Sequence, residues 1–161
     1  MKHSDELDIR LIGVSEVKRA SVLHHWEMMR YEGGKVNVGL SASFNMSRES
    51  SIATVIVGVH YTTLRSQVIR KLMDYTVKAS FEISDLQGLV DIEYGDILIP
   101  PGLLHLMLSV SIGALRGMLA LRTANTFLAH YPLPLMDLTE IMSHMDMGIG
   151  RVLTPLQAYT P

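Results

Sequence analysis

The stretch Val36–Met46 alternates apolar and polar side chains without exception. The even positions carry Val36, Val38, Leu40, Ala42, Phe44 and Met46, and the odd positions carry Asn37, Gly39, Ser41, Ser43 and Asn45. Successive side chains of a strand point to opposite faces, so this period of two predicts a strand with one buried and one solvated face. The chain must therefore build a sheet that other elements cover on one side.

Three further segments predict strands of the same sheet. Residues 73–84 repeat the strict alternation, and residues 52–62 are rich in β-branched side chains, with the odd-numbered residues 53–61 on the expected core side. Residues 9–17 alternate with a phase slip near Ile12 and Gly13, which indicates a β-bulge. Turns are predicted between the last three strands, at 47–51 and around 65–70. We expect four antiparallel strands, three of them in a meander.

The last third of the chain changes to helical patterns. Pro101 suits the first turn of a helix, and residues 103–124 carry Leu, Met and Ile on nearly every face. Pro132 and Pro134 predict an extended link. The motif Asp137-Leu-Thr-Glu140 has the spacing of a capping box and starts a second helix that reaches about residue 147. Strands followed by helices indicate an α+β domain, with a long and a short C-terminal helix on one face of a four-stranded antiparallel sheet.

A stripe of small side chains runs along the long predicted helix. Ser109, Gly113 and Gly117 lie four residues apart, and small residues at that spacing let another backbone come close. Each helical glycine costs about 1 kcal/mol, so a packing gain should offset it. Two interpretations remain open: packing on the chain's own sheet, or contact between helices of two subunits. The apolar fraction of 48% favours the second interpretation.

Composition limits the class of protein. The 161 residues fit a single domain, with a core expected within 5–147 and a loose tail at 148–161. The absence of cysteine excludes disulfides and thiolate metal sites, and a net charge of −2 excludes nucleic-acid binding through bulk charge. The charged residues 1–8 lack a signal-peptide core, and prolines break the longest uncharged run, 97–115. We therefore expect a cytoplasmic protein without membrane insertion.

No residue pattern argues for catalysis or for a cofactor. The chain lacks dinucleotide, P-loop, serine-hydrolase and zinc-protease motifs. His24 and His25 are adjacent, so a strand would point them apart, and we interpret His105 in its apolar helix as a core histidine. An acidic run contains Glu82, Asp85, Asp91, Glu93 and Asp96. This run leaves three alternatives: a solvated face, a docking surface for a basic partner, or a divalent-metal site. We expect a protein that is not an enzyme.

Two clusters of soft apolar side chains lie in peripheral segments. The first, in a segment that fits neither period, contains Trp26, Met28, Met29 and Tyr31. The second, along the short helix at i, i+3, i+4 and i+7, contains Leu138, Ile141, Met142 and Met145. Flexible, polarizable methionine suits the binding of many partners, and the alternative is gap filling in a core. We expect Met142 and Met145 to be exposed, and Leu138 and Ile141 to face the sheet in part.

Several segments resemble one protein family. They are Val36-Asn-Val38-Gly-Leu40, Tyr75-Thr-Val77-Lys-Ala79-Ser-Phe81-Glu-Ile83, Pro101, Arg116-Gly117 and Leu133-Pro134-Leu135-Met136-Asp137-Leu138. In these segments, and in the order of its elements, the chain resembles the SecB-type export chaperones over about residues 5–147.

The resemblance implies an assembly and an activity. The assembly would be a homotetramer, a dimer of dimers with the long helices sandwiched between sheets, and Ser109, Gly113 and Gly117 would line a subunit interface. The activity would be that of an ATP-independent holdase. Unfolded client polypeptides would lie in grooves beside the two apolar clusters.

The chain departs from the export members of the family in its charges. Those members engage the SecA motor through acidic sheet positions and a tail. Here residues 154–161 carry no charge and the solvated sheet face is mostly Ser, Asn and Thr, which places docking to SecA in doubt. A divergent member serving one dedicated client, as in relatives linked to toxin–antitoxin systems, fits as well as general export. The alternative function is a non-catalytic oligomeric scaffold or regulator without a client groove.

Overall fold

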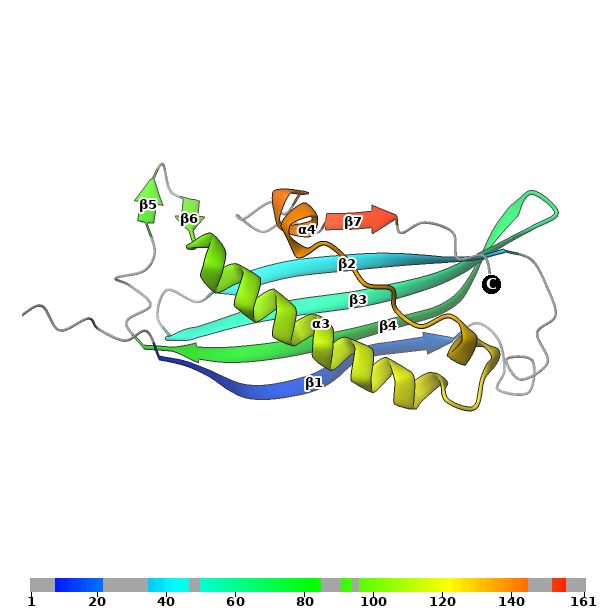
Figure 1. Cartoon of the computed structure of the whole chain (residues 1–161), viewed down its shortest axis with the longest axis horizontal. Coiled ribbons are helices and arrows are strands. Elements are labelled where there is room, and N and C mark those ends of the chain that lie inside the picture. The colour runs from blue at the N-terminus through cyan, green and yellow to red at the C-terminus, as the bar shows by residue number, and fades with distance from the viewer. Residues whose placement is uncertain are drawn as a thin grey trace, which may run out of the picture.

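The computed structural model describes residues 8–21, 35–46, 50–84, 91–93, 96–144 and 152–155. The main sheet is antiparallel, in the order β1 (Ile9–Ser21), β4 (Val68–Ile83), β3 (Ile52–Arg65), β2 (Val36–Met46) and β7 (Val152–Pro155) (Figure 1). Two short strands, β5 (Asp91–Glu93) and β6 (Asp96–Leu98), form a separate pair. The long helix α3 (Pro101–Thr123) crosses one face of the main sheet, and the short helix α4 (Leu138–His144) follows. The predicted α+β class, the four long strands and the two helices are confirmed.

The sequence alternation accounts for the core. On β2 the even residues from Val36 to Phe44 are buried, and the odd residues 37–43 between them are half-buried. The odd residues 53–61 of β3 and 73–83 of β4 are buried in the same way, on the face that α3 covers. The predicted bulge in β1 is confirmed by a register shift between Leu11 and Gly13, and a second shift follows between Glu16 and Lys18.

The hairpin between β3 and β4 is longer than the sequence indicated. The strands run to Arg65 and resume at Val68, so the turn consists of Ser66 and Gln67 alone. Both turn residues have positive φ, 50° and 64°, which is the geometry of a type I′ turn. Asn and Gly normally mark such turns, and because neither is present the sequence predicted a broader turn around 65–70.

One other expectation was wrong in part. The segment expected to be a loose tail, 148–161, contains β7, which pairs with Gly39–Ala42 of β2 and makes the main sheet five-stranded. The long helix, expected over 103–124, runs from Pro101 to Thr123, and a 3₁₀ turn over Phe127–His130 precedes the extended link.

Helix α3 is long and apolar enough to span a membrane by length and composition alone. In this fold one side of it packs into the core, where Leu104, Met107, Leu108 and Leu115 are fully buried. It is therefore the core helix of the α+β domain. His105 lies on the opposite side and is exposed, so its interpretation as a core histidine was wrong.

Candidate binding surfaces

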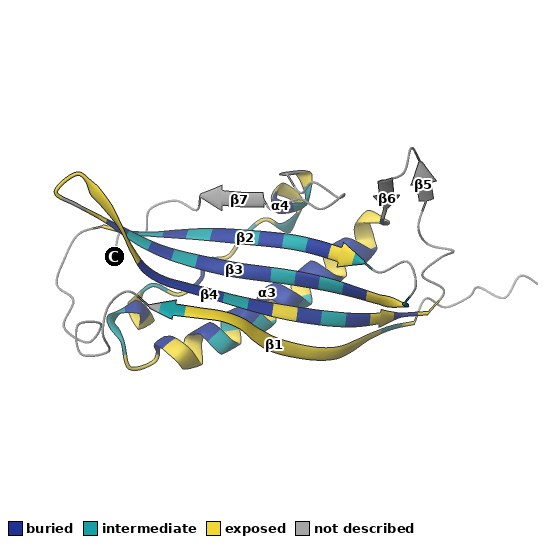
Figure 2. Ribbon diagram, turned by 180° about the vertical axis from the view of Figure 1, so that it is seen from behind, coloured by how far each residue is buried: buried dark blue, intermediate teal, exposed yellow. Residues whose placement is uncertain are grey.

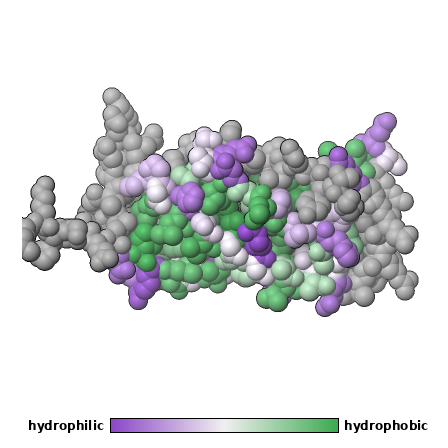
Figure 3. All heavy atoms as spheres, viewed as in Figure 1, coloured by the Kyte–Doolittle hydropathy of each residue, from purple (hydrophilic) through white to green (hydrophobic). Residues whose placement is uncertain are grey.

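The outer face of α3 carries the stripe of small residues. Ser109, Gly113 and Gly117 are exposed, and Leu106 and Leu121 flank them with 48% and 81% of their surfaces accessible. A Cβ atom at Gly113 or Gly117 would meet no atom within 4 Å. Packing on the chain's own sheet is therefore wrong as the explanation of the stripe. Figure 3 shows apolar surface over the face that carries α3.

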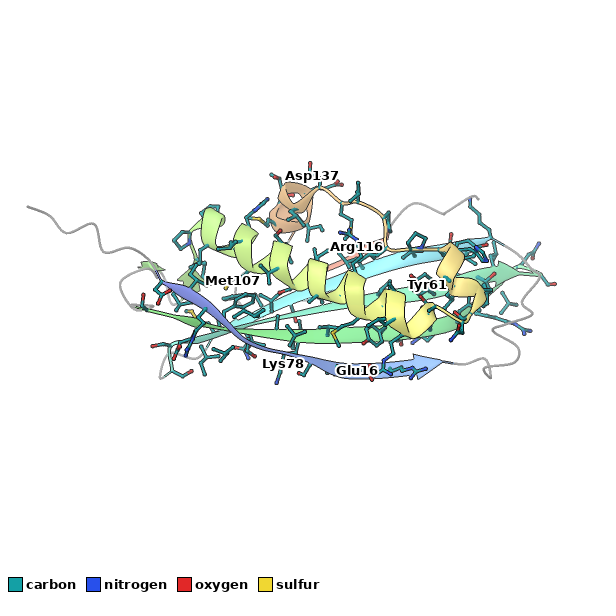
Figure 4. All side chains as sticks on the ribbon, turned by 60° about the horizontal axis from the view of Figure 1, so that its bottom comes forward. Glu16, Tyr61, Lys78, Met107, Arg116 and Asp137 are labelled. Carbon is teal, nitrogen blue, oxygen red and sulfur yellow. The ribbon has the colours of Figure 1, made fainter. Side chains whose placement is uncertain are left out.

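The extended link after the 3₁₀ turn is fastened at two points. Tyr61 of β3 donates a hydrogen bond from Oη to the carbonyl oxygen of Tyr131 at 2.7 Å. Arg116 of α3 donates from Nη2 to the carbonyl oxygen of Pro134 at 3.0 Å. Figure 4 shows Arg116 between α3 and the link, and Tyr61 near the link's other end. These bonds fix the backbone on both sides of Leu133.

The fixed link holds one leucine in the core and leaves another in water. Leu133 is 4% exposed, whereas Leu135 is 91% exposed. A large apolar side chain is therefore held in water on a tethered backbone. The sequence search for binding residues missed Leu135, although its place after Pro134 was a usable signal.

Helix α4, which follows the link, carries part of the second apolar cluster. Asp137 accepts a hydrogen bond from the backbone N–H of Thr139 at 2.8 Å, which confirms its predicted capping role. Leu138 and Met142 are half-buried against the core, together with Met136, so the expectation that Met142 is exposed was wrong. Ile141 is 4% exposed and belongs to the core, so it is removed from the candidate binding residues. We call Leu135, Met136, Leu138 and Met142 the link–α4 surface.

Some predicted residues lie outside the part of the chain that the structure describes. They are Trp26, Met28, Met29, Tyr31 and Met145, as well as His24, His25 and Asp85. Of the acidic run, Glu82 forms an ion pair with Arg10, while Asp91, Glu93 and Asp96 belong to β5 and β6. Among the described residues no group of three or more His, Asp or Glu side chains is arranged to hold a metal ion.

The solvated sheet face contains a polar network that the sequence did not predict. His60 on β3 bonds through Nδ1 to Asp74 Oδ1 at 2.8 Å and through Nε2 to Ser41 Oγ at 3.2 Å. Lys18 and Lys71 both donate to Asp74 Oδ2, at 3.2 and 2.8 Å. Burial alone would raise the pKa of Asp74, but the hydrogen bonds from Lys71, His60 and Lys18 lower that pKa from 3.8 to about 2. The Asp74 carboxylate is therefore firmly ionised.

The connectivity of Ser41, His60 and Asp74 is that of a serine-hydrolase triad. Acyl transfer also needs N–H donors aimed at the oxyanion that forms beside the serine. Ser41 pairs with Gly58 of β3 on one side and with Leu153 of β7 on the other, so its backbone lies within the sheet ladder. Two lysines also share the charge of Asp74. We interpret the network as a structural connection between β1, β4, β3 and β2.

Comparisons with known proteins give one similarity in structure. The chain matches neither a family model nor a curated protein. It is similar to Mycobacterium tuberculosis Rv1957, a SecB-like chaperone solved in complex with a ChAD peptide from the Rv1956 HigA1 antitoxin. The two share 15% identity over 80% of this chain and 86% of that chain, with a TM-score of 0.47. Rv1957 bears the name of the family that the sequence of the present chain resembles. The function proposed below for the present chain rests on the surfaces of that chain.

Proposed function

We propose that the protein is a non-catalytic, ATP-independent chaperone that binds unfolded or partly folded polypeptides. The carrying observation is the link–α4 surface, where Leu135 is 91% exposed on a backbone fastened by Tyr61 and Arg116. An apolar side chain held open in this way gains free energy when another chain covers it. The resemblance of the sequence to SecB-type chaperones supports the same proposal.

The proposed contacts combine the link–α4 surface with Met145 and the first cluster, Trp26, Met28, Met29 and Tyr31. Covering one Leu or Met side chain contributes roughly 1.5–3 kcal/mol. Half-buried side chains such as Leu138 and Met142 contribute less, because part of their surface is already removed from water. Several such contacts reach micromolar affinity after the cost of ordering the client is subtracted. Unbranched methionine adapts to different client sequences.

We further propose that subunits associate through the outer faces of their α3 helices. The glycines leave room for a partner backbone, and Leu106 and Leu121 supply the apolar contact. The proposed assembly is a homotetramer in the cytoplasm, with a dimer as the fallback. General export and service to one dedicated client remain equally consistent with the chain, and SecA is not among the proposed partners.

The chaperone proposal is tested with a client that cannot refold. Reduced, carboxymethylated α-lactalbumin has blocked cysteines, so it stays unfolded and cannot exchange thiols with the protein. We expect the protein to bind it and to delay aggregation of a denatured model enzyme at stoichiometric ratios, equally with and without ATP. Failure to bind this probe and to delay aggregation would refute the proposal and leave the scaffold alternative.

The methionines provide a sharper version of this test. Changing Met28, Met29, Met142 and Met145 together to Ser should leave the oligomer intact and weaken probe binding at least about tenfold. The matched control is Leu121→Ser on the α3 face, which should alter assembly instead. If the quadruple variant unfolds while its folded fraction binds normally, the methionines are core residues.

The assembly proposal has its own test in Gly113→Leu. A Cβ atom at this position would meet no atom within 4 Å beyond the helix's own backbone, and leucine is a better helix former than glycine by about 1 kcal/mol. The subunit alone should therefore gain stability, while overpacking at the interface costs about 1–3 kcal/mol per site. Light scattering should show smaller particles for the variant. A wild type that stays monomeric at micromolar concentration would contradict the proposal.

A further inference from the structure

Strand β2 is the last long strand on its side of the sheet, and it lacks the usual protection of an edge strand. Natural edge strands carry charges, prolines or bulges that prevent pairing with a foreign chain. The eleven residues of β2 include no charged residue and no proline, and their register with β3 has no shift. Such an edge is a template for strand addition, so something must cover it in the folded protein.

The cover that the structure shows is β7, and it is short. Val152, Leu153, Thr154 and Pro155 pair with Ala42, Ser41, Leu40 and Gly39 of β2. Residues 36–38 and 43–46 of β2 lie beyond this pairing. Within the described residues, β7 is the only strand that pairs with this side of β2, and it covers four positions. This side of β2 therefore accepts an added strand.

The position of β7 links this edge to the link–α4 surface. In Figure 1, β7 lies along β2 next to α4, which precedes it in the chain. A polypeptide placed along β2 would therefore run beside α4. Main-chain hydrogen bonds to the edge would supply affinity without regard to sequence, and side-chain contacts at α4 would favour apolar residues.

We propose that the edge of β2 is a strand-addition site for the client, and that β7 occupies it until an extended client segment displaces it. The inference rests on the proposed chaperone function and names how the client is held. The fitting segment is extended and uncharged, because the positions of β2 that it would pair with carry no charge to match. It is apolar at the positions in register with Leu40 and Ala42, whose side chains belong to the core face.

The test locks β7 in place. Ser41 and Leu153 are direct cross-strand partners, and such pairs have Cα separations within the range that a disulfide spans. The chain has no native cysteine, so Ser41→Cys with Leu153→Cys forms one defined bridge. Locking β7 leaves the edge closed, and probe affinity falls with the fraction of open molecules, by roughly tenfold or more. Reduction of the same sample should restore binding, and the Ser41→Cys single variant should not respond to reduction.

A second variant removes the cover instead. Replacing Val152–Pro155 by Gly-Ser-Gly-Ser keeps the chain length but removes strand-forming residues. Carboxymethylated α-lactalbumin should then bind several-fold more tightly than to the wild type. If the locked and reduced forms bind the probe equally, or if the replacement leaves probe binding unchanged, the strand-addition inference is wrong. Binding of the probe by the wild type would still support the chaperone proposal. A wild type that fails to bind the probe would refute both.

Discussion

The outermost long strands of the described sheet, β1 and β2, are built in opposite ways. Strand β1 has two register shifts against β4 and carries four charged residues, Arg10, Glu16, Lys18 and Arg19, and nearly all of it is exposed. Strand β2 has no shift and no charge, and every second residue through most of its length is buried. Figure 2 shows this contrast, with β1 exposed along its length and β2 alternating between buried and half-buried.

Different side-chain contacts hold the two strands to the sheet. At β1 the side-chain links are ion pairs: Arg10 with Glu82, Lys18 with Asp74, and Glu16 with Arg122 of α3. At β2 the even residues pack in the apolar core, and Ser41 bonds to His60 of β3. Charged side chains discourage another chain from pairing with β1. A packed strand without charges is stable and can still pair with an added strand. The proposed binding activity therefore belongs to the β2 side.

The change of leucine to alanine, made once on each strand, should give the largest difference in the free energy of unfolding. Leu40 on β2 is 1% exposed, and its change to Ala should lower the free energy of unfolding by about 2–5 kcal/mol. Leu11 on β1 is 45% exposed, and the same change should cost at most about 1 kcal/mol. Urea unfolding of both variants measures the difference. Equal losses would show that β1 is packed as tightly as β2.

Acid should weaken the β1 side through Asp74. The pKa of this carboxyl is about 2 in the folded protein against 3.8 ordinarily, so its stabilising contribution is complete above about pH 4 and is lost as the pH falls towards 2. The Asp74→Asn variant lacks this dependence. We expect the difference in unfolding free energy between wild type and variant to shrink over that interval. A difference that stays constant from pH 6 to about pH 2 would contradict the assigned ion pairs.

The smallest effect is expected for the exposed pair of Arg10 and Glu82. Their side chains are 69% and 48% exposed, so water and salt screen the attraction. Arg10→Ala should lower the free energy of unfolding by less than about 1 kcal/mol, and added salt should remove that loss. A loss as large as that of Leu40→Ala would mean that β1 depends on this pair, against the division between the edges.

Sequence reasoning located the elements that bury one face. The uninterrupted alternation of β2 fixed its bounds, and the phase slip at Gly13 located the first bulge of β1. Local sequence patterns did not show how segments far apart in the chain pair with one another. Strand β7 has four residues and ends in a proline, so its local pattern carries too little information to indicate a partner. The network of Ser41, His60 and Asp74 depends on the register of three strands, which no local pattern specifies.

The candidate site was predictable only in outline. Helical spacing grouped Leu138, Ile141 and Met142 correctly on α4 but did not tell that Ile141 enters the core while the others stay half-buried. Helix α3 is apolar on nearly every side, so the sequence did not show which side faces the sheet. For that reason His105 was assigned to the core, and the open side of the stripe at Gly113 remained undecided.

Amide hydrogen exchange in the presence of carboxymethylated α-lactalbumin tests the central claim most directly, because it reports both edges in one experiment. We expect residues 36–38 and 43–46 of β2 and the residues of α4 to gain protection when the unfolded probe binds, and β1 to stay unchanged. Protection gained along β1 with β2 and α4 unchanged, or no change at either edge while the probe is bound, would contradict it.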